Sequence, residues 1–525
     1  MSSRPTTMGT CPYCRSVTLA GDTICYTCGR VLANIKSKQF AAEQQFNQGS
    51  IETTYLKTRK PTKAGVVQTH TGRKKNILKR RKNRFRSVVM LGLVAFIMLS
   101  PQARELVFNK WAGVSEYIQL AAAPYHLYPI ETTYTVGEVV EVTNIGPNGA
   151  VYEELMIPRD ISTIYGQTTM FDYTDDTESL PAQKIQEIIA ITLTVNDVDY
   201  SIPLLGEPAR MPTDKLVTVD GHEIWWPGVG VGDDMCSVDI CVKISLNLQP
   251  QEDTFFTYAV TLKSTSYSWW SSNRVDSRVN GGDYGINLDR SGDFSDIIDR
   301  GGGVKASQFT DSLWYGKDRI DYAINSQDAI VISTAQTISA TLPEGLSENA
   351  YAFARATFDY LHKHIPYDKN APVEARSGPV CLTDGLGDCD EQTNAYLSIL
   401  RTKGIPGWYV LGALTDSKYQ NWEAHAWGYI LLPMSDDWCN SRNIVIDDCF
   451  IEGSVDVVNN KWLLHTPTAF IDWIEEADAS GNLVHNYFHP KYVMDVDRTR
   501  TIETLGAAET TGGTYQIKKL PEILR

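Results

Sequence analysis

Residues 387–401 read GDCDEQTNAYLSILR, the pattern of an amphipathic helix with a cysteine at its first position. Asp388 and Glu391 have the spacing of a capping box, with Asp in place of Ser or Thr. Gly404 is expected just after the end of this helix, where glycine is the commonest residue. Cys389 would then lie at the positive end of the helix dipole, where main-chain N–H groups could also bind an oxyanion.

The sequence neighbours of this cysteine oppose its ionisation. Asp388, Asp390 and Glu391 place negative charge close to any thiolate formed at Cys389. A positively charged imidazole partner is therefore needed to favour the thiolate. The sequence that follows the helix has to supply this histidine.

Three predicted strands follow the helix and supply both a histidine and an acid. Residues 408–414 (WYVLGAL) and 422–429 (WEAHAWGY) have the apolar pattern of strands, and His425 lies in the second. Residues 443–447 (NIVID) are a third predicted strand, which ends in Asp447. Because neighbouring antiparallel strands bring side chains together, we expect Asp447 to orient the His425 ring and stabilise its cation.

The order of these segments resembles the transglutaminase-like core, a papain-like cysteine fold in which Cys, His and Asp come in this order. The shared features are G-D-C at a helix start, L-R-x-K-G-I-P after the helix, H-A-W in a strand, and a hydrophobic strand that ends in Asp. The resemblance covers about residues 347–450, and residues 365–367 (IPY) also resemble the segment after the family's first helix. It implies Cys389 as nucleophile, His425 as base and Asp447 as orienting acid.

One part of the family pattern differs in this chain. Cys449 and Phe450 follow the predicted acid, where the family often has Pro-Thr. The adjacent Asp448 is therefore an alternative to Asp447, although it would point to the opposite face of the strand.

The resemblance implies acyl transfer from a peptide bond or a glutamine side-chain amide. Cys389 would attack the carbonyl, His425 would carry the proton, and a thioester would form. Water would then give a protease or amidase, whereas an amine would give a cross-linker, and resemblance to prokaryotic members favours hydrolysis. The alternative is a non-enzymatic membrane adaptor, in which this domain only binds a partner and the N-terminal module carries the function.

The net charge of −15 hides a division of the chain near residue 86. Residues 1–86 hold 18 Lys and Arg against 3 Asp and Glu, which leaves 30 of the 48 basic and 60 of the 63 acidic residues for the remainder. Such a division of charge indicates that residues 1–86 and the remainder of the chain lie in different surroundings. Because basic residues beside an apolar segment stay cytoplasmic, residues 1–86 are expected inside the cell and the acidic remainder outside it.

An apolar segment follows the basic run directly. Residues 88–99 read VVMLGLVAFIML and carry no charge. A bilayer span takes about 20 residues, a length that is reached if the flanking Arg84 and Arg104 extend to the two interfaces. We interpret residues 87–104 as a signal anchor in the lipid bilayer of the cell membrane. The alternatives are a cleaved signal sequence and a buried core helix.

Two pairs of cysteines near the N-terminus have the spacing of a zinc ribbon. Cys11 with Cys14 and Cys25 with Cys28 give CxxC, ten residues, CxxC. Each turn can present two sulfurs to one metal, so the four thiolates complete a structural Zn2+ site. A reducing cytoplasm opposes two disulfides, and two pairs at this spacing oppose a redox motif. The module could bind a protein or a nucleic acid.

Apolar residues alternate with polar ones between residues 131 and 265, which predicts a β-sandwich. The runs are residues 189–195, 238–248 and 256–262. The glycine- and aspartate-rich segment 266–340 could bind calcium through its acidic loops. It matches no EF-hand loop, so a solvated acidic linker is expected instead.

These observations predict a multidomain α+β chain. The expected parts are a zinc ribbon (1–35), a basic cytoplasmic linker (36–86), a transmembrane signal anchor (87–104), a β-sandwich (131–265), a linker or extension (266–340), a transglutaminase-like catalytic domain (341–475) and a C-terminal tail (476–525).

Five further cysteines lie in the part expected outside the cell, where disulfides are allowed. Their short separations suggest the pairs Cys236–Cys241 and Cys439–Cys449, which would leave Cys381 free. The alternative is that all five are small buried hydrophobic residues.

Overall fold

The computed structural model describes most of the chain after residue 124 and two short segments before it. The described residues are 8–10, 17–19, 125–162, 184–204, 216–225, 241–272, 275–300, 312–314, 322–372, 375–474, 482–483 and 491–518. The chain divides into two compact units, Met1–Arg104 and Glu105–Arg525.

The described part of the first unit is an antiparallel hairpin. β1 (Met8–Thr10) pairs with β2 (Val17–Leu19), with Met8 opposite Leu19 and Thr10 opposite Val17. The predicted zinc ligands Cys11, Cys14, Cys25 and Cys28 lie outside the described residues, as do the basic linker and the predicted anchor at 87–104. Among the described helices, none is both long and apolar enough to cross a membrane.

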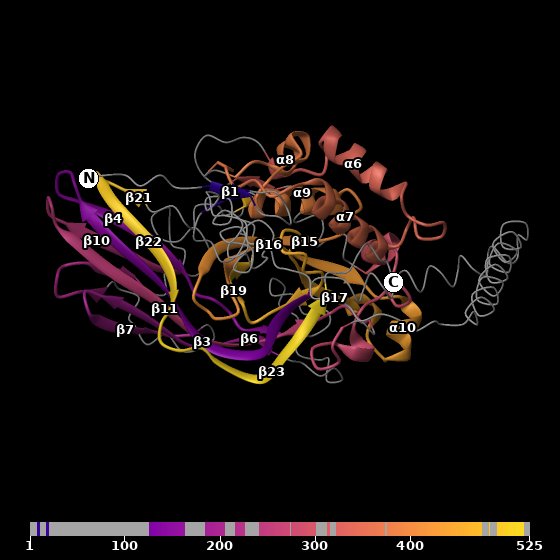
Figure 1. Ribbon diagram of the computed structural model, residues 1–525, viewed down its shortest axis with the longest axis horizontal. Helices are drawn as coiled ribbons and strands as arrows, with labels where there is room; N and C mark the ends of the chain where they lie inside the picture. Colours follow the sequence, from indigo (N-terminus) through magenta and orange to yellow (C-terminus); the bar gives the residue numbers. More distant parts are fainter. Residues whose placement is uncertain are drawn as a thin grey trace, which may run out of the picture. The chain divides into compact units, whose positions relative to one another are not determined.

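Two antiparallel sheets of the second unit form a β-sandwich (Figure 1). Among the described residues, the larger sheet has the order β22-β3-β11-β6-β5, with β23 also on β3 and β7 on β6, and the smaller has the order β21-β4-β10-β9-β8. The larger sheet is built from β3 (Tyr125–Asn144), β5 (Ile161–Ser162), β6 (Lys184–Val195), β7 (Val198–Ile202), β11 (Asp253–Thr265), β22 (Val496–Thr504) and β23 (Glu509–Lys518). The smaller is built from β4 (Gly149–Met156), β8 (Leu216–Val217), β9 (Glu223–Trp225), β10 (Cys241–Leu248) and β21 (Lys491–Tyr492).

Alternating apolar side chains fill the space between these two sheets, as predicted. Val140, Leu193 and Phe256 of the larger sheet and Val151 and Ile244 of the smaller belong to one buried cluster. Burial of such side chains is the main favourable term in the folding of a sandwich.

The alternation predicted for residues 189–195 fails at its first position. The pairing of β11 with β6 shifts between Thr261 and Leu262, so that Ile189 is an extra residue in a β-bulge. The bulge exposes half of the Ile189 side chain and buries Ile188 in its place. From Ile191 onward the predicted face is the buried one.

Residues 496–518 of the predicted C-terminal tail belong to the sandwich. β22 pairs with the C-terminal half of β3 and β23 with its N-terminal half, so that Lys518 lies opposite Tyr125. A polar contact also ties β22 to the smaller sheet, because Arg498 makes a two-pronged ion pair with the buried Glu153 of β4 at 2.7 and 2.9 Å. The described residues between β11 and β21 therefore form an insertion into the sandwich.

The segment 266–340 is also packed where the structure describes it, and these residues are not a solvated linker. Trp269, Trp270, Ile286 and Phe294 are buried in the same cluster as the helices that follow. These apolar residues lie between the aspartates that suggested a loop, and Asp293 instead begins a short helix. The elements of this segment are β12 (Tyr267–Ser268), η1 (Gly282–Tyr284), α4 (Phe294–Asp299), β13 (Ser312–Trp314), β14 (Tyr322–Ile324) and α6 (Ala329–Ser339).

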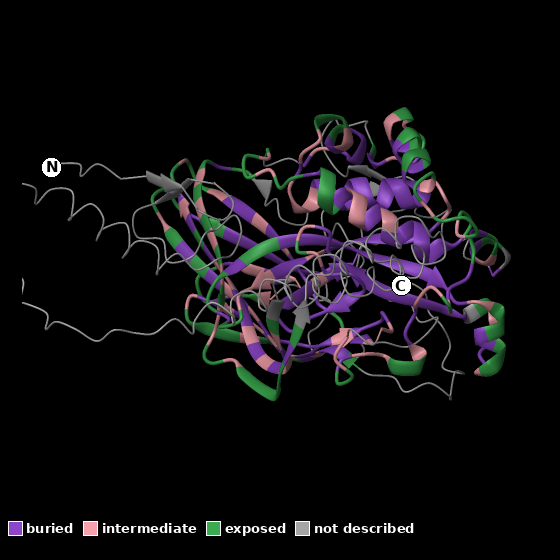
Figure 2. Ribbon diagram, turned by 45° about the vertical axis from the view of Figure 1, so that its right-hand side comes forward, coloured by how far each residue is buried: buried purple, intermediate pink, exposed green. Residues whose placement is uncertain are grey.

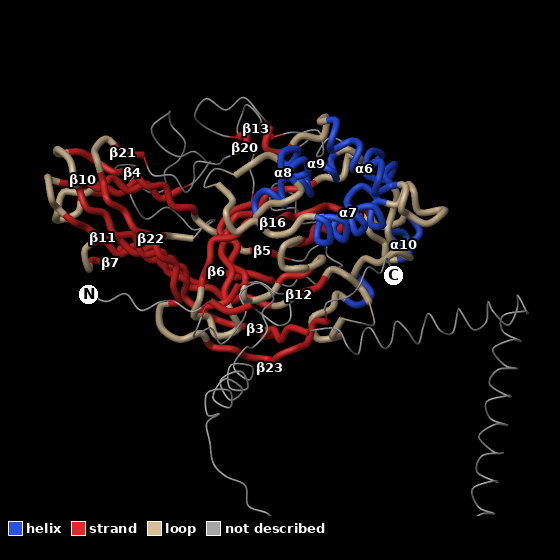
Figure 3. Tube along the Cα trace, turned by 45° about the horizontal axis from the view of Figure 1, so that its top comes forward, coloured by secondary structure: helices blue, strands red, loops and turns tan. Residues whose placement is uncertain are grey.

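A four-stranded antiparallel sheet and the helices packed on it complete the insertion, and in Figure 1 the helices lie together beside β15 and β16. The order of this sheet is β17-β16-β15-β19. Figure 3 shows α6, α7, α8 and α9 gathered beside β16. The elements are α7 (Ala350–His364), α8 (Gly378–Asp384), α9 (Cys389–Arg401), β15 (Gly407–Thr415), β16 (Trp422–Pro433), α10 (Asp436–Ser441), η2 (Ile446–Asp448), β17 (Phe450–Val455), β18 (Leu464–His465), β19 (Ala469–Ile474) and β20 (Asn482–Leu483).

The helix α9 lies at the centre of the helices that pack on the four-stranded sheet. Every residue of α9 from Glu391 to Arg401 is buried, because α7 and α8 cover one side and β15 and β16 the other. Figure 2 shows buried residues running through the strands and along the inward sides of the helices. The buried amide of Gln186 on β6 bonds the main chain of Ile471 on β19 at 2.8 and 3.0 Å, which ties the sandwich to the four-stranded sheet.

Candidate active site

Cys389 is the first residue of α9, as predicted from the sequence. The capping box is present, and the Glu391 carboxylate accepts the main-chain N–H of Asp388 at 2.9 Å. Gly404 follows the helix with a φ of 71°, a conformation that favours glycine. The thiol is half-buried, and the main-chain N–H of Ala426 donates to its sulfur. The helix start therefore fixes the cysteine against the strand β16.

The surroundings of Cys389 keep its sulfur protonated at rest. Burial raises the pKa of the Cys389 thiol well above its usual range, and the charges of Asp390 and Asp388 raise it further. The N–H of Ala426 lowers it, but by less. This agrees with the expectation that acidic neighbours oppose the thiolate. A base must therefore remove the proton as the sulfur attacks.

His425 on β16 pairs with the carboxylate of Asp456, with 3.1 Å between Nε2 and Oδ2. Both side chains are buried. Asp456 also accepts the main-chain N–H of Asn459 at 3.0 Å and the side-chain amide of Asn459 at 2.8 Å. Burial raises the pKa of Asp456, but the His425 cation and hydrogen bond, the charge of Lys461 and the Asn459 N–H lower it to about 2. Asp456 is therefore an anion at neutral pH.

This hydrogen bond decides which nitrogen of His425 can act as a base. An ionised carboxylate only accepts hydrogen bonds, so the contact with Asp456 assigns the ring hydrogen to Nε2. Nδ1 is then the proton acceptor. The residue after His425 is Ala426, whose N–H lies on the sulfur of Cys389. The structure thus brings Cys389, His425 and Asp456 together.

The predicted acid Asp447 does not lie at His425, and Asp456 takes that place. Residues 443–447, predicted as the third strand, instead form the loop after α10 and the start of the 3-10 helix η2. Asp447 lies in η2 and is exposed. The third strand is β17, and Asp456 is the residue that follows it. The side chain of the alternative, Asp448, lies outside the described residues.

A sequence signal for Asp456 existed in the same family pattern. Residues 450–456 read FIEGSVD, which is also a strand that ends in aspartate. Val455 pairs with Gly428, so the continued register puts Asp456 opposite Trp427, which shares a strand face with His425. Two segments, 443–447 and 450–456, therefore fit the pattern of a hydrophobic strand that ends in aspartate. The one that pairs with β16 is the second, which leads to Asp456.

Tyr367, in the IPY segment that follows α7, is a further residue near the thiol. Its main chain forms a bridge with Gly387, and its ring is 50% exposed. Burial of its hydroxyl raises the pKa of Tyr367 above its usual range, and the charges of Cys389, Asp388 and Glu423 raise it further. The hydroxyl is therefore a hydrogen-bond donor near the thiol at neutral pH.

Two carboxyl groups flank the thiol on its own helix. Burial, the hydrogen bond that protonated Asp390 donates to Asp388, and the charge of Asp388 raise the pKa of Asp390 to about 9. The pair therefore shares a proton at neutral pH. Oxygen and sulfur atoms of Asp388, Cys389 and Asp390 lie within 4.8 Å of one another, a spacing that a cation could bridge. The shared proton already lowers the charge of this group.

The cysteines follow the predicted pairing where they are described. Cys439 and Cys449 form a disulfide, and Cys241 is also disulfide-bonded. Cys381 is free and buried, and burial raises its pKa to about 12. The Cys439–Cys449 bond closes the connection between β16, which carries His425, and β17, which leads to Asp456. Cys236 lies outside the described residues, so its pairing stays a prediction.

Comparisons with known proteins identify this part of the chain. The model of the transglutaminase-like superfamily matches residues 336–441, which include Cys389 and His425. A comparison with curated proteins finds no match.

Two solved structures are similar to the chain at low identity. One is a proposed cysteine protease from Cytophaga hutchinsonii, 10% identical over 75% of this chain and 94% of that chain, with a TM-score of 0.36. The other is the periplasmic domain of TgpA from Pseudomonas aeruginosa bound to ethylmercury, 11% identical over 59% of this chain and 90% of that chain, with a TM-score of 0.21.

Proposed function

We propose, from the premise that residues 336–441 form a transglutaminase-like domain, that the chain is a cysteine-dependent enzyme of acyl transfer. The observation that carries the proposal is the convergence of a thiol, an imidazole and a buried carboxylate from three separate elements. Cys389 begins α9, His425 lies within β16 and Asp456 follows β17. A structural role needs none of these three groups in this arrangement.

The first step of the proposed reaction is formation of a thioester. The sulfur of Cys389 attacks the carbonyl carbon of an amide while its proton passes to Nδ1 of His425. Asp456 stabilises the resulting imidazolium through the hydrogen bond at Nε2. Main-chain N–H groups at the start of α9 can stabilise the oxyanion. The imidazolium then gives its proton to the leaving amine as the carbon–nitrogen bond breaks.

The second step decides the kind of enzyme. Attack of water on the thioester releases an acid and restores the thiol, whereas attack of an amine forms a new amide. We propose hydrolysis, as a protease or amidase acting on protein or peptide substrates. This choice rests on analogy with family members and not on a group in the site.

We also propose that residues 87–104 anchor the chain in the cell membrane, with residues 1–86 cytoplasmic and the catalytic part outside. The charge division at residue 86 supports this orientation. The Cys439–Cys449 disulfide supports an oxidising compartment for the catalytic part. Protease added outside intact cells tests it, and digestion of residues 1–86 with protection of the catalytic part would reject it.

The N-terminal module is proposed to hold a structural Zn2+ through Cys11, Cys14, Cys25 and Cys28. Its support is their spacing and the β1–β2 hairpin, whose strands flank Cys11 and Cys14 in the sequence. A protein or a nucleic acid is the proposed cytoplasmic partner. Metal analysis of the reduced, purified chain tests the site, and a preparation without zinc would reject it.

The experiment that tests the enzyme compares the full-length chain with its Cys389→Ala variant on peptide and glutamine amides, with and without an added amine. We expect release of ammonia or amine by the wild type and no turnover by the variant, because no other group forms the thioester. Cys381→Ala is the matched control, since this second free thiol is buried. Equal turnover by wild type and Cys389→Ala would reject the thiol mechanism and favour the adaptor.

A further inference from the structure

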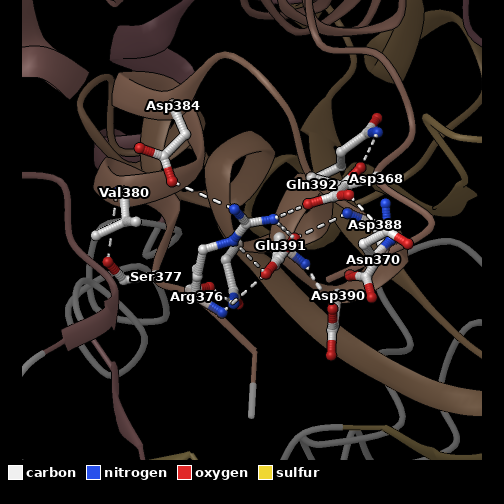
Figure 4. A network of polar contacts seen from close by, with 12 residues as sticks. Asp368, Asn370, Arg376, Ser377, Val380, Asp384, Asp388, Asp390, Glu391 and Gln392 are labelled. Carbon is white, nitrogen blue, oxygen red and sulfur yellow. Dashed lines mark hydrogen bonds and ion pairs between the residues drawn. The ribbon is translucent and has the colours of Figure 1, made fainter. Parts of the chain in front are cut away.

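Arg376 joins three segments of the chain next to the nucleophile (Figure 4). Its guanidinium contacts carboxylates of Glu391 at 2.7 and 2.9 Å, Asp368 at 2.7 Å and Asp384 at 3.3 Å. Glu391 lies in the first turn of α9, Asp368 lies after α7 and Asp384 ends α8. One side chain therefore connects the segment after α7 with the end of α8 and the start of α9.

The contact with Glu391 fixes the helix that carries Cys389. Glu391 is fully buried, and the same carboxylate accepts the main-chain N–H groups of Asp388 at 2.9 Å and Arg376 at 3.1 Å. Asp388 is the residue before Cys389. The carboxylate is thus shared between the arginine and the helix start, so a shift of one is transmitted to the other.

The contact with Asp368 fixes the segment that carries Tyr367. The N–H of Asp368 donates to the carbonyl of Gly387 at 3.0 Å, and the N–H of Gly387 donates to that of Pro366 at 3.3 Å. Gly387 is closely packed, because a Cβ there would lie 2.7 Å from the sulfur of Cys381. Small displacements of this segment therefore move the residues just before Cys389.

We propose that Arg376 is a positioning residue, which holds Tyr367 and Cys389 in fixed relation by joining Asp368 to Glu391. The inference rests on the proposed function only in taking Cys389 as the reacting thiol. A planar guanidinium can bond both oxygens of Glu391 and one of Asp368 at once, whereas an ammonium acts as a single point charge. Arg376→Lys should therefore keep the charge and lose the connection.

Asp384 offers a matched comparison for Asp368. Both carboxylates contact the same guanidinium, but Asp384 is 43% exposed and lies away from the pairing with Gly387, whereas Asp368 is 15% exposed and part of it. If Asp368 and Asp384 act on the thiol only through their negative charge, both Asp368→Asn and Asp384→Asn should speed its alkylation. If Asp368 instead holds Tyr367 and Cys389 in position, Asp368→Asn alone should slow it.

The experiment measures the rate of alkylation of Cys389 by iodoacetamide between pH 6 and 10 in the full-length chain, with Cys389→Ala as the background. We expect Asp368→Asn and Arg376→Lys to lower the rate at pH 7.5 by about tenfold, because small misplacements of a reacting group have effects of this size or more. Asp384→Asn should match the wild type. No substrate is needed, so the result is independent of the assay for turnover.

Two outcomes would overturn the inference. The first is a rate profile of Asp368→Asn that overlays the wild type or changes together with that of Asp384→Asn. The second is a fall in the alkylation rate of Cys389 in Arg355→Lys as large as that in Arg376→Lys. Arg355 is a buried arginine with an ion pair to Asp359 on α7, outside the segments that Arg376 joins. That control should lower only the unfolding temperature. If Arg376→Lys does not fold, the Asp368 and Asp384 pair decides alone.

Discussion

Two acidic regions lie beside the proposed imidazole and thiol, and the pKa of the carboxyl group is lowered in one and raised in the other. Asp456, beside His425, is buried and has its pKa lowered to about 2. Asp390, beside Cys389, has its pKa raised to about 9. Burial acts in the same direction on both. The difference therefore comes from the neighbours, which are a histidine, a lysine and amide donors for Asp456 but other carboxylates for Asp390.

The comparison teaches that hydrogen-bond donors, and not depth, decide which carboxyl is charged. In the proposed reaction a charge at Asp456 is useful, because His425 would become a cation when it takes the thiol proton. A charge at Asp390 would oppose the same step, since it lies beside the sulfur. The two regions thus favour a protonated thiol at rest and, in the proposed reaction, an imidazolium during attack.

The largest effect should come from removing the charge at Asp456. Asp456→Asn keeps the shape but can no longer accept from Nε2 as an anion, so the imidazolium loses its stabilisation. We expect kcat to fall roughly 10³–10⁴-fold, as when the orienting acid of a catalytic triad becomes an amide. Asp447→Asn is the control and should leave kcat unchanged, since Asp447 is exposed on η2. The reverse order of effects would restore Asp447 as the acid.

A smaller and opposite effect should come from Asp390→Asn. As pH rises through about 9, the wild-type pair loses its shared proton and a second charge forms beside the sulfur. Alkylation of Cys389 should therefore level off above pH 9 in the wild type but continue to rise in the variant. At pH 7 the shared proton gives the wild-type pair the same single charge that Asp388 has in the variant, so the two rates should match. At pH 10 we expect the variant to react about tenfold faster, a change that corresponds to one unit in the thiol pKa.

The same change gives a stability test of known sign. A carboxyl whose pKa is raised on folding binds its proton more tightly in the folded state. Its contribution is therefore present below the unfolded pKa, near 4, and is lost as pH rises to about 9. Asp390→Asn should raise the unfolding temperature at pH 8 and not at pH 4. Equal shifts at both pH values would mean that Asp390 is not protonated in the folded chain.

The smallest effect should come from Asn459→Ala. The change removes one donor to Asp456, the side-chain amide at 2.8 Å, and keeps the main-chain N–H at 3.0 Å. One hydrogen bond is worth about 1 kcal/mol, so kcat should fall about fivefold. A loss as large as that of Asp456→Asn, in a chain with an unchanged unfolding temperature, would contradict the view that several donors share the carboxylate.

Local signals predicted the positions of Cys389 and His425 in the proposed site, and non-local pairing explains why they did not predict Asp456. The capping box and the cysteine at the helix start depend on residues within four positions, so they were read correctly. His425 was found because its strand carries a recognised motif. Asp456 was missed because two segments end in aspartate, and only the register of β17 on β16 decides between them. The family model that supports the assignment ends at residue 441, before either candidate.

The fold shows the same division. Alternation predicted a sandwich, yet it could not locate the bulge at Ile189, which depends on the opposing strand β11. The polar residues 496–518 gave no signal, because β22 and β23 are stabilised by pairing with β3 and by ion pairs such as Arg498 with Glu153. The segment 266–340 was judged by its aspartates, whereas its tryptophans decide where it lies.

The long strand β3 has a consequence for the order in which the chain is made. Thr132 of β3 meets Thr510 of β23, 378 positions later. At roughly 5–20 residues per second, synthesis leaves that edge of β3 without its partner for roughly 20–75 s. An unpaired strand edge is a site of aggregation, and the whole insertion emerges during this interval. A ribosome that stops before residue 509 would release a chain with this edge open, so early termination should be more damaging to solubility than loss of the last polar residues would suggest.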